Sequence, residues 1–435
     1  MQSPTRRLFI QDGFRIVSVG LALPHIFTRA AHAADLEAGR DPSALHQAGS
    51  DPMARRTLIV VQMAGGNDGL NTVVPYADPA YAKLRGGLGL SETERLPLDD
   101  RFALHGAMGG MKSIWDAGQL GIVHGVGYPN PNFSHFASMD VWQTGAVESR
   151  GGEGVLARLV KNVVDKKGHP FAGFAASPSV PPALSAPDLS VAAVENPATF
   201  TIVPDRRYAA DQAVREDALI KLHTVPGAGG EFHDAFAMTA TAAQQTVARV
   251  QYAHSSYQPT VEYPKDGFGV GLRLLAEAVC ADLGVRVGYI TLGGFDTHAG
   301  QKGAQARLLQ TLSDGLKAFW SDMHGHGRAD DVLVMTWSEF GRRAAENASG
   351  GTDHGAAGTQ FIIGSGLHGG HWGEPVRLDH LDRGNVRHTT DFRSVYATVM
   401  DRWLGVPSET ILGARHQPLG FLSGPRTVRA RDATD

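Results

Sequence analysis

The sequence predicts an α/β protein in which a mostly parallel β-sheet lies between layers of helices. Apolar runs of strand length alternate along the chain with longer helical patterns, as they do when helices cover both faces of a sheet. Two of these runs, at residues 285–292 and 332–337, lead directly into Asp, Glu and His residues. Ligands bind just beyond the carboxyl ends of the strands in open sheets of this class, so these residues mark the expected site.

Composition and charge narrow the class of protein. The chain has 435 residues, of which 42% are hydrophobic and 19% are charged, as in a globular protein. Its formal net charge is −4 and it contains no basic run, which argues against nucleic acid as a partner. Cys280 is the single cysteine, which excludes an intramolecular disulfide and any cysteine-rich zinc motif. Its apolar helical surroundings predict a core position.

The N-terminus resembles a targeting segment. Residues 1–33 contain the twin-arginine pattern Thr5-Arg6-Arg7-Leu8-Phe9-Ile10, a modestly apolar stretch at 16–27, and an Ala-His-Ala cleavage site at 31–33. The apolar stretch is too short to span a membrane. We therefore expect the twin-arginine export machinery to deliver the protein to the periplasm or the exterior, without a stable membrane span. Residues 34–56 are polar and patternless, which predicts a flexible leader.

The first half of the mature chain is expected to begin with a buried strand. Residues 57–63 form a continuous apolar run that ends at two glycines, and residues 120–126 form a second such run. A Pro- and Asn-rich turn then leads to Ser134, which is placed to cap a helix that runs through Trp142. Residues 169–200 are rich in Ala, Ser and Pro, and irregular structure is expected there. Helical patterns follow at about 207–222 and 232–254.

The second half carries the clearest alternation of helices and strands. Residues 303–324 place apolar side chains at helical spacing, which predicts a long amphipathic helix. The other expected elements are a helix at 268–283, strands at 285–292, 332–337 and 359–363, and a last helix at 391–404. We expect one large domain at 57–425, with a cap or insertion at 169–260 and a tail at 426–435.

Acidic and histidine residues follow the predicted strands. Asp68 comes after the first strand within a Gly-Asn-Asp-Gly segment, which is equally typical of a turn that caps its own backbone. Asp296 and His298 are spaced to lie on one face of an extended segment, where they can share a metal or form a turn with a surface histidine. Asp353 and His354 lie in a glycine-flanked loop. Such residues are usual ingredients of a metal site or an acid/base site.

Two further candidates have structural alternatives. Glu339 ends a buried strand, where it either serves a metal or acid/base site or forms an ion pair with Arg342 or Arg343. Ser134, beside His135, stands at a predicted helix N-terminus, where free N–H groups and the helix dipole stabilise an anion. The hydroxyl is therefore either a nucleophile or a plain helix cap.

Taken together, these motifs resemble a bacterial family of exported proteins, domain of unknown function 1501. The resemblance covers nearly all of the mature chain and is carried by the motifs GGNDGLNTVVPY at 65–76, LHGAM at 104–108, SHFASMDVWQTG at 134–145, GGFDTHAGQ at 293–301, SEFGRR at 338–343, GTDHG at 351–355 and TTDFRSVYATVM at 389–400. This family looks like a distant relative of the alkaline phosphatase and sulfatase superfamily. The resemblance implies an alkaline-phosphatase-like fold with two metal ions at the strand ends and a nucleophile that attacks an ester.

The resemblance also implies roles for individual residues. Asp68 matches the carboxylate ligand after the first strand, and Ser134 matches the nucleophile at a helix N-terminus. Phe340 follows Glu339 where the superfamily carries a histidine, which puts the second metal in question. The complete candidate set is Ser134, His135 and Arg342 for catalysis, and Asp68, Asp296, His298, Glu339, Asp353 and His354 for metal binding.

The expected function is that of an exported, metal-dependent hydrolase. One or two divalent ions (zinc, magnesium, manganese or calcium) would assist cleavage of a phosphate or related ester on a small molecule or a polymer. The alternative is a non-catalytic relative that has become a secreted binding or assembly protein. A third reading is chemistry on a sugar or another polymer that uses the same carboxylates without a metal.

Overall fold

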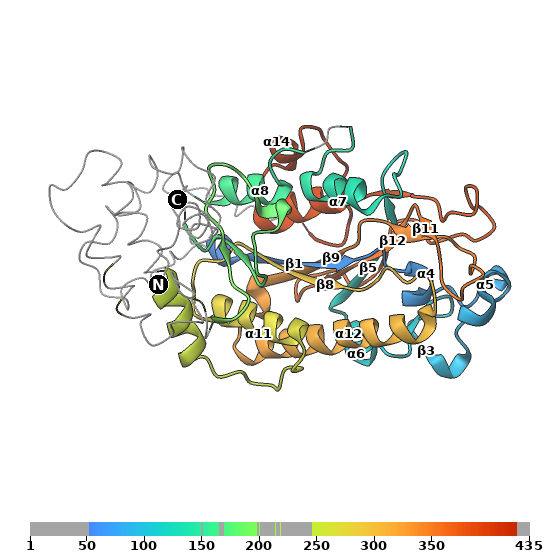
Figure 1. Ribbon diagram of the computed structural model, residues 1–435, viewed down its shortest axis with the longest axis horizontal. Coiled ribbons are helices and arrows are strands. Elements are labelled where there is room, and N and C mark those ends of the chain that lie inside the picture. The colour runs from blue at the N-terminus through green and yellow to red at the C-terminus, as the bar shows by residue number, and fades with distance from the viewer. Residues whose placement is uncertain are drawn as a thin grey trace, which may run out of the picture.

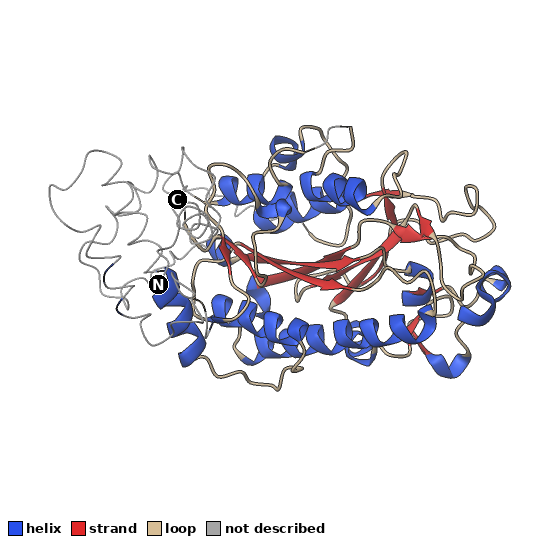
Figure 2. Cartoon of the chain, in the orientation of Figure 1, coloured by secondary structure: helices blue, strands red, loops and turns tan. Residues whose placement is uncertain are grey.

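The predicted architecture is confirmed by a computed structural model, in which a nine-stranded sheet lies between two layers of helices (Figures 1 and 2). The structure describes residues 52–148, 151–164, 169–197 and 246–423, together with residues 200, 214 and 218. The expected signal segment at 1–33, most of the leader at 34–56, most of the helical pattern at 207–222 and the tail at 426–435 lie outside the described residues.

The sheet is mixed but mostly parallel. Its strand order is β13-β5-β12-β9-β1-β8-β6-β7, and β14 also pairs with β5. Among the described strands of this sheet, β12 alone runs antiparallel to its neighbours, β5 and β9. The strands are β1 (Thr57–Ala64), β5 (Leu120–Gly127), β6 (Gly173–Ala175), β7 (Ala192–Ala193), β8 (Val287–Gly293), β9 (Val332–Trp337), β12 (Gly358–Ile363), β13 (Gly370–Trp372) and β14 (Thr390–Asp391).

Strand β1 is buried on both faces, as its continuous apolar run predicts. Leu58 and Val60 pack into the core on one side of the sheet, whereas Ile59 and Val61 pack into the core on the other. This division follows from the alternation of side chains along a strand. Because β1 pairs in parallel with both β8 and β9, the carboxyl ends of these three strands meet at one edge.

Helices cover both faces of the sheet (Figure 1). One layer contains α7 (His135–Thr144), α8 (Val155–Val163), α13 (Phe392–Thr398) and α14 (Ser408–Leu412). The opposite layer contains α6 (Gly109–Asp116), α11 (Gly267–Cys280) and α12 (Gln301–Gly325). Within the described ranges, no helix combines the length and the apolar character needed to cross a membrane.

Short elements surround the carboxyl edge of the sheet. The segment after β1 contains α4 (Gly69–Thr72), α5 (Pro79–Arg85) and a small sheet made of β2 (Val73–Val74), β4 (Ala103–His105) and β3 (Arg95–Pro97). After β9 the chain forms a two-stranded ribbon, β10 (Gly341–Arg342) with β11 (His354–Gly355). This ribbon places Arg342 opposite His354.

Most predicted elements are confirmed to within about three residues at each end. The expected last helix at 391–404 is α13 followed by a π-helical segment, Val399–Leu404, with Asp391 as the N-cap. The described part of the helix expected at 232–254 begins at residue 246. Cys280, predicted to be a core residue, is half-buried and packs against the core.

One secondary-structure prediction was wrong. Residues 169–200 were expected to be irregular, but they contribute two short strands to the sheet, β6 and the edge strand β7. These strands contain three and two residues, which is too short for a period-two pattern to be visible in the sequence. They exist because β6 pairs in parallel with β8, and this long-range contact is not encoded by local composition.

A buried histidine pair joins β5 to β13 at one edge of the sheet. His124 is 1% exposed, and its Nε2 lies 2.7 Å from Nδ1 of His371. A carboxylate oxygen of Asp99 lies 3.2 Å from Nε2 of His371. Burial, assisted by the neighbouring His371, lowers the pKa of His124 to about 3. The folded protein therefore holds His124 neutral at pH values where an exposed histidine is charged.

We predict that this histidine makes the fold sensitive to acid. The unfolded chain protonates His124 near the ordinary pKa of about 6.5, so folding stability falls as the pH drops from there towards 3. By pH 5 the loss from this group is about 2 kcal/mol. The test is urea unfolding at pH 7.5 and pH 5.0. Between these two pH values, the free energy of unfolding of His124→Gln should fall by about 2 kcal/mol less than that of the wild type. Equal losses in the two proteins would contradict the assignment.

Candidate metal centre

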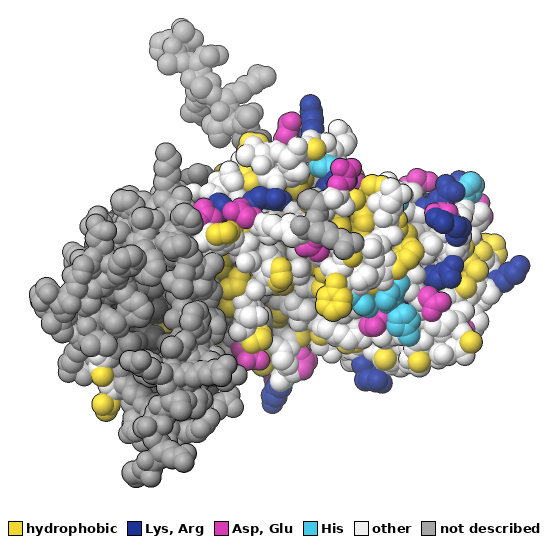
Figure 3. Space-filling model, turned by 45° about the horizontal axis from the view of Figure 1, so that its top comes forward, with side chains coloured by type: hydrophobic (Ala, Val, Ile, Leu, Met, Phe, Trp, Pro, Cys, Tyr) yellow, Lys and Arg dark blue, Asp and Glu magenta, His cyan; other side chains and the backbone are white. Residues whose placement is uncertain are grey.

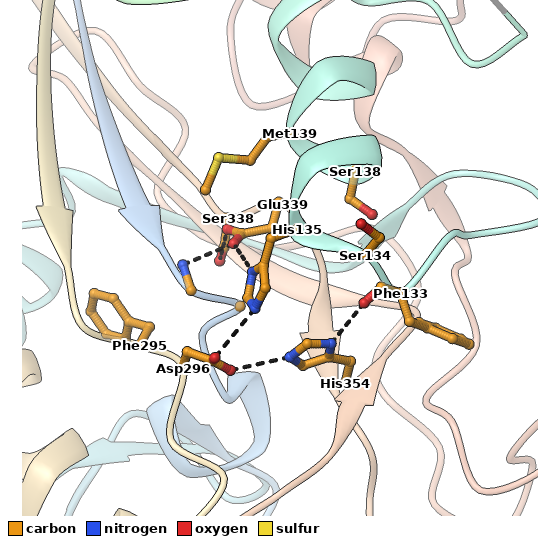
Figure 4. Close-up of polar contacts among 12 residues, drawn as sticks. Phe133, Ser134, His135, Ser138, Met139, Phe295, Asp296, Ser338, Glu339 and His354 are labelled. Atoms are coloured by element: carbon orange, nitrogen blue, oxygen red, sulfur yellow. Dashed lines mark hydrogen bonds and ion pairs between the residues drawn. The ribbon is translucent and has the colours of Figure 1, made fainter. Parts of the chain in front are cut away.

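Side chains from separate segments meet at the carboxyl edge of the sheet, and histidine and acidic side chains lie side by side on the face shown in Figure 3. Asp296 and His298 follow β8, His354 begins β11, and His135 begins α7. The carboxylate of Asp296 lies at the centre (Figure 4). Its oxygens are 3.0 Å from Nε2 of His298, 3.1 Å from Nε2 of His354 and 3.4 Å from Nε2 of His135. We call these four residues the histidine–aspartate cluster.

Glycine in the first strand-end loop allows the segments to approach so closely. Gly65 has a φ of 120°, and a Cβ atom built on it would lie 2.4 Å from the backbone nitrogen of Asp296. A side chain at Gly65 would therefore push the loop after β8 away from the loop after β1. The glycine that ends β1 thus helps to position Asp296 as well as interrupting the strand.

The backbone fixes the protonation pattern of His354. Its Nδ1 lies 2.7 Å from the carbonyl oxygen of Phe133. A carbonyl oxygen can only accept a hydrogen bond, so Nδ1 carries the proton. In the neutral ring Nε2 then presents its lone pair to the cluster, which is the arrangement required of a metal ligand.

A buried carboxylate orients His135 in the same way. Nδ1 of His135 lies 2.8 Å from Oε1 of Glu339, which is fully buried and also accepts the backbone N–H of Gly65 at 2.9 Å. Because this carboxylate oxygen accepts a hydrogen bond from the Nδ1 side of the ring, Nε2 is directed towards Asp296. Glu339 thus supports a cluster histidine. The alternative in which Arg342 neutralises Glu339 is wrong, because that arginine pairs with Asp296.

His298 is held more loosely than the other two histidines. Its Nδ1 lies 3.8 Å from a carboxylate oxygen of Asp353, and its side chain is 45% exposed. The amide of Asn347 donates to both Asp353, at 3.1 Å, and the carbonyl of His298, at 3.0 Å. Nε2 of His298 lies 2.9 Å from Nε2 of His354. Two imidazole nitrogens at this distance need either one shared proton or a cation between them.

Arg342 ties the cluster to the loops that carry it. Its buried guanidinium lies 2.7 Å from Oδ1 of Asp296. It also donates to the backbone carbonyls of Gly65, Gly66, Phe295 and Thr352. Burial acts to raise the pKa of Asp296, but the hydrogen bond and positive charge of Arg342, together with the neighbouring histidines, outweigh it and lower the pKa to about 2. Asp296 is therefore an anion across the physiological pH range.

Phe340, which stands where the superfamily resemblance leads one to expect a histidine, forms a wall of the cluster. Its buried ring lies 4.9 Å from the ring of His135 and 4.4 Å from that of His354, measured between centroids. It packs directly over Gly66, where a Cβ atom would lie 2.3 Å from the ring. The aromatic ring restricts the movement of both histidines and offers no ligand atom.

Asp68 lies apart from the cluster, in a buried ion pair. Both of its carboxylate oxygens accept hydrogen bonds from Arg85, one of them at 2.8 Å, and both side chains are almost fully buried. Its Oδ1 also caps α4 through the N–H of Leu70. Gln301 of α12 donates to the same carboxylate. The ion pair between Asp68 and Arg85 could not be predicted from local sequence, because Arg85 lies in a short helix with no distinctive motif.

Ser134 occupies the N-cap position of α7, as expected, but its hydroxyl makes no capping hydrogen bond. Its side chain is exposed and lines a cavity of about 450 Å³ together with Phe136 and Asp140. The described contacts that hold the cluster together do not include the Ser134 hydroxyl. The role of Ser134 as a nucleophile stays a prediction.

Comparison with known proteins places the chain in a family without assigning an activity. A family model described as "Protein of unknown function (DUF1501)" matches residues 55–419. No curated protein matches the sequence significantly. Distantly similar solved structures include PsFucS1 sulfatase from Pseudoalteromonas sp. (TM-score 0.37, 11% identity, covering 93% of this chain and 77% of that chain). Another is the lipoteichoic acid synthase LtaP from Listeria monocytogenes (TM-score 0.32, 9% identity, covering 85% and 75%).

We predict that Asp68 contributes to stability rather than to metal binding. Asp68→Asn leaves the buried guanidinium of Arg85 without its counter-charge, which should cost about 3–5 kcal/mol of unfolding free energy in urea titrations. The double variant Asp68→Leu/Arg85→Met removes both charges and should recover much of the loss. A folded Asp68→Asn protein with wild-type stability that has lost a bound metal would contradict this assignment.

Proposed function

The chain belongs to the DUF1501 family, and we propose that it is an exported, metal-dependent hydrolase that cleaves a phosphate or a related ester. The observation that carries the proposal is the convergence of three imidazole Nε2 atoms on the carboxylate of Asp296. Ligand atoms of His135, Asp296 and His354 all lie within 4.8 Å of one another. Two of these imidazoles and the carboxylate make a donor set suited to zinc or a similar transition-metal ion, and His298 lies beside this three-residue set.

The spacing of the cluster supports this donor set. Four ligands at about 2.0–2.1 Å from a tetrahedral ion lie about 3.3 Å from one another. The distances of 3.1 and 3.4 Å from Asp296 to His354 and His135 are close to that value. The rings of His135 and His354 are also held from behind by Glu339 and by the Phe133 carbonyl, as metal-ligating histidines usually are.

The surroundings of the cluster suit a hydrolytic reaction. A divalent ion bound there would supply a Lewis acid that polarises an ester oxygen and lowers the pKa of the attacking group. The side chain of Asp296 is 46% exposed, so a substrate can reach the cluster from solvent.

We propose a single ion at the cluster. Among the two-metal ligands implied by the superfamily resemblance, Asp68 is already neutralised by Arg85. The position after Glu339 carries the apolar ring of Phe340, and Glu339 itself is turned towards His135. Ser134 remains our candidate nucleophile because it directly precedes His135 at the exposed start of α7.

A second candidate function is supported by the Arg342–Asp296 ion pair. The guanidinium already neutralises Asp296, and a proton shared between His298 and His354 satisfies the remaining nitrogens. The cluster can thus persist as a hydrogen-bonded network without a metal. In that case the protein would be a secreted binding or assembly protein that keeps the fold of an enzyme.

Metal content distinguishes these candidates. We expect elemental analysis by inductively coupled plasma mass spectrometry to find about one divalent ion per chain in the purified mature protein. Asp296→Asn should lose the ion because it removes the negative charge of the carboxylate, and His354→Ala should lose it because it removes a ligating nitrogen. The exposed His380 lies outside the cluster, so His380→Ala should retain the ion and serves as the matched control. Metal-free wild type with normal stability would favour the binding protein.

Activity tests the role of Ser134. The metal-loaded protein should hydrolyse 4-nitrophenyl phosphate or 4-nitrophenyl sulfate, and a chelator should abolish the reaction reversibly. Ser134→Ala should lower kcat by about 100-fold or more while the ion stays bound, because the attacking group is lost but the ligands are kept. Full activity in this variant would show that another group attacks the ester. Bound metal without turnover of either substrate would count against the hydrolase.

A further inference from the structure

A cavity of about 810 Å³ lies beside the cluster and is lined by basic side chains. Arg343, Arg383, Arg387 and His388 contribute to its walls, and Asp382 is the acidic residue among the lining side chains. All three arginines are exposed. A concave surface with this excess of positive charge concentrates anionic ligands.

Most of this positive charge is not neutralised within the protein. Asp382 lies 3.5 Å from Arg383, and both side chains are largely exposed. Arg343 donates to the backbone carbonyl of Arg383 at 2.6 Å, an interaction that positions the guanidinium and leaves its charge in place. In the described part of the chain, no carboxylate forms an ion pair with Arg343 or Arg387. Two guanidinium groups are therefore available to a ligand.

The cavity and the histidine–aspartate cluster share a wall. The side chain of Phe133 lines the cavity, while its carbonyl oxygen accepts the hydrogen bond from His354. Arg343 lines the cavity, while the preceding residue, Arg342, pairs with Asp296 of the cluster. Because successive side chains of an extended segment point to opposite sides, one backbone segment serves both places.

The cavity also offers an apolar surface. The ring of Phe133 is 42% exposed, and Pro131 and Val386 contribute to the same lining. A ligand bound here can therefore place carbon atoms against Phe133 while its charged end meets the arginines. Pockets that bind organic molecules generally combine apolar walls with a few fixed polar groups.

We propose that this arginine cavity binds a second negatively charged group of the substrate, while the ester to be cleaved lies at the cluster. The planar guanidinium of Arg343 or Arg387 can bind a phosphate, sulfate or carboxylate through two parallel hydrogen bonds. The preferred substrates are then esters that carry at least two anionic groups. Their role as substrates rests on the proposed hydrolase function, but binding of the anion to the cavity requires no metal.

Anion binding is tested first without metal. Chelator-treated protein is titrated with inorganic pyrophosphate by calorimetry, and Arg387→Ala and Arg343→Ala should each raise Kd by about tenfold or more. Arg377→Ala is the matched control, because this exposed arginine pairs with Asp379 and does not line the cavity. His298→Ala, which alters the cluster at a residue that does not line the cavity, should leave Kd unchanged. Competition by sulfate or succinate then shows which anion the cavity prefers.

The outcomes separate this inference from the hydrolase proposal. Absence of pyrophosphate binding to the wild type, equal Kd values in Arg387→Ala and the wild type, or loss of binding in His298→Ala would each overturn the cavity as the anion site. In an active enzyme, Arg387→Ala should raise KM for an aryl phosphate that carries a carboxylate and leave KM for 4-nitrophenyl phosphate unchanged. If the cavity binds the anion but the protein contains no metal and turns over no substrate, the hydrolase proposal is rejected and the anion site is retained.

Discussion

The guanidinium of Arg342 is the interaction on which the carboxyl edge of the sheet depends. It is buried, and it donates to backbone carbonyls in the loop after β1, the loop after β8 and the segment before β11. Its remaining interaction is with the carboxylate of Asp296. A buried cation must be surrounded by acceptors, so these loops are constrained to converge on it. The position of Asp296, and with it the arrangement of the histidines, follows from this constraint.

Around Arg342 the protein keeps two buried acids in different roles. Asp68 is neutralised by Arg85 and anchors the segment after β1. Glu339 faces His135 and the backbone N–H of Gly65, so its charge orients an imidazole and helps position a loop. Asp296 alone among the three is substantially exposed, and it is the carboxylate on which the histidines converge. Burial thus separates the two structural carboxylates from the one that is open to solvent.

Sequence predicted well the edge of the sheet at which acidic and histidine residues gather, and predicted the partners of these residues poorly. The glycine-terminated strands and the acids after them follow from local patterns, and the Asp296-Thr297-His298 spacing indicated a shared face. Asp68 looked equivalent to the other strand-end acids, because each follows an apolar run. Its pairing with Arg85 depends on contacts between α5 and the segment that contains Asp68 and α4, which no local pattern specifies. The hydrogen bond between His354 and the carbonyl of Phe133 could not be predicted either, because every residue has a backbone carbonyl and no local pattern selects this one.

By itself the sequence determined the α/β class, the central buried strands and the edge at which polar residues gather. Hydrophobic periodicity and glycine positions act over a few residues, and they specify secondary structure and strand ends directly. Only the tertiary structure decided which acids meet histidines, which meet arginines, and that a basic cavity shares a wall with the cluster. These outcomes depend on contacts between residues far apart in the chain, such as Arg342 with Gly66 and His135 with Glu339. Long-range contacts are selected by packing and by the need to pair buried charge.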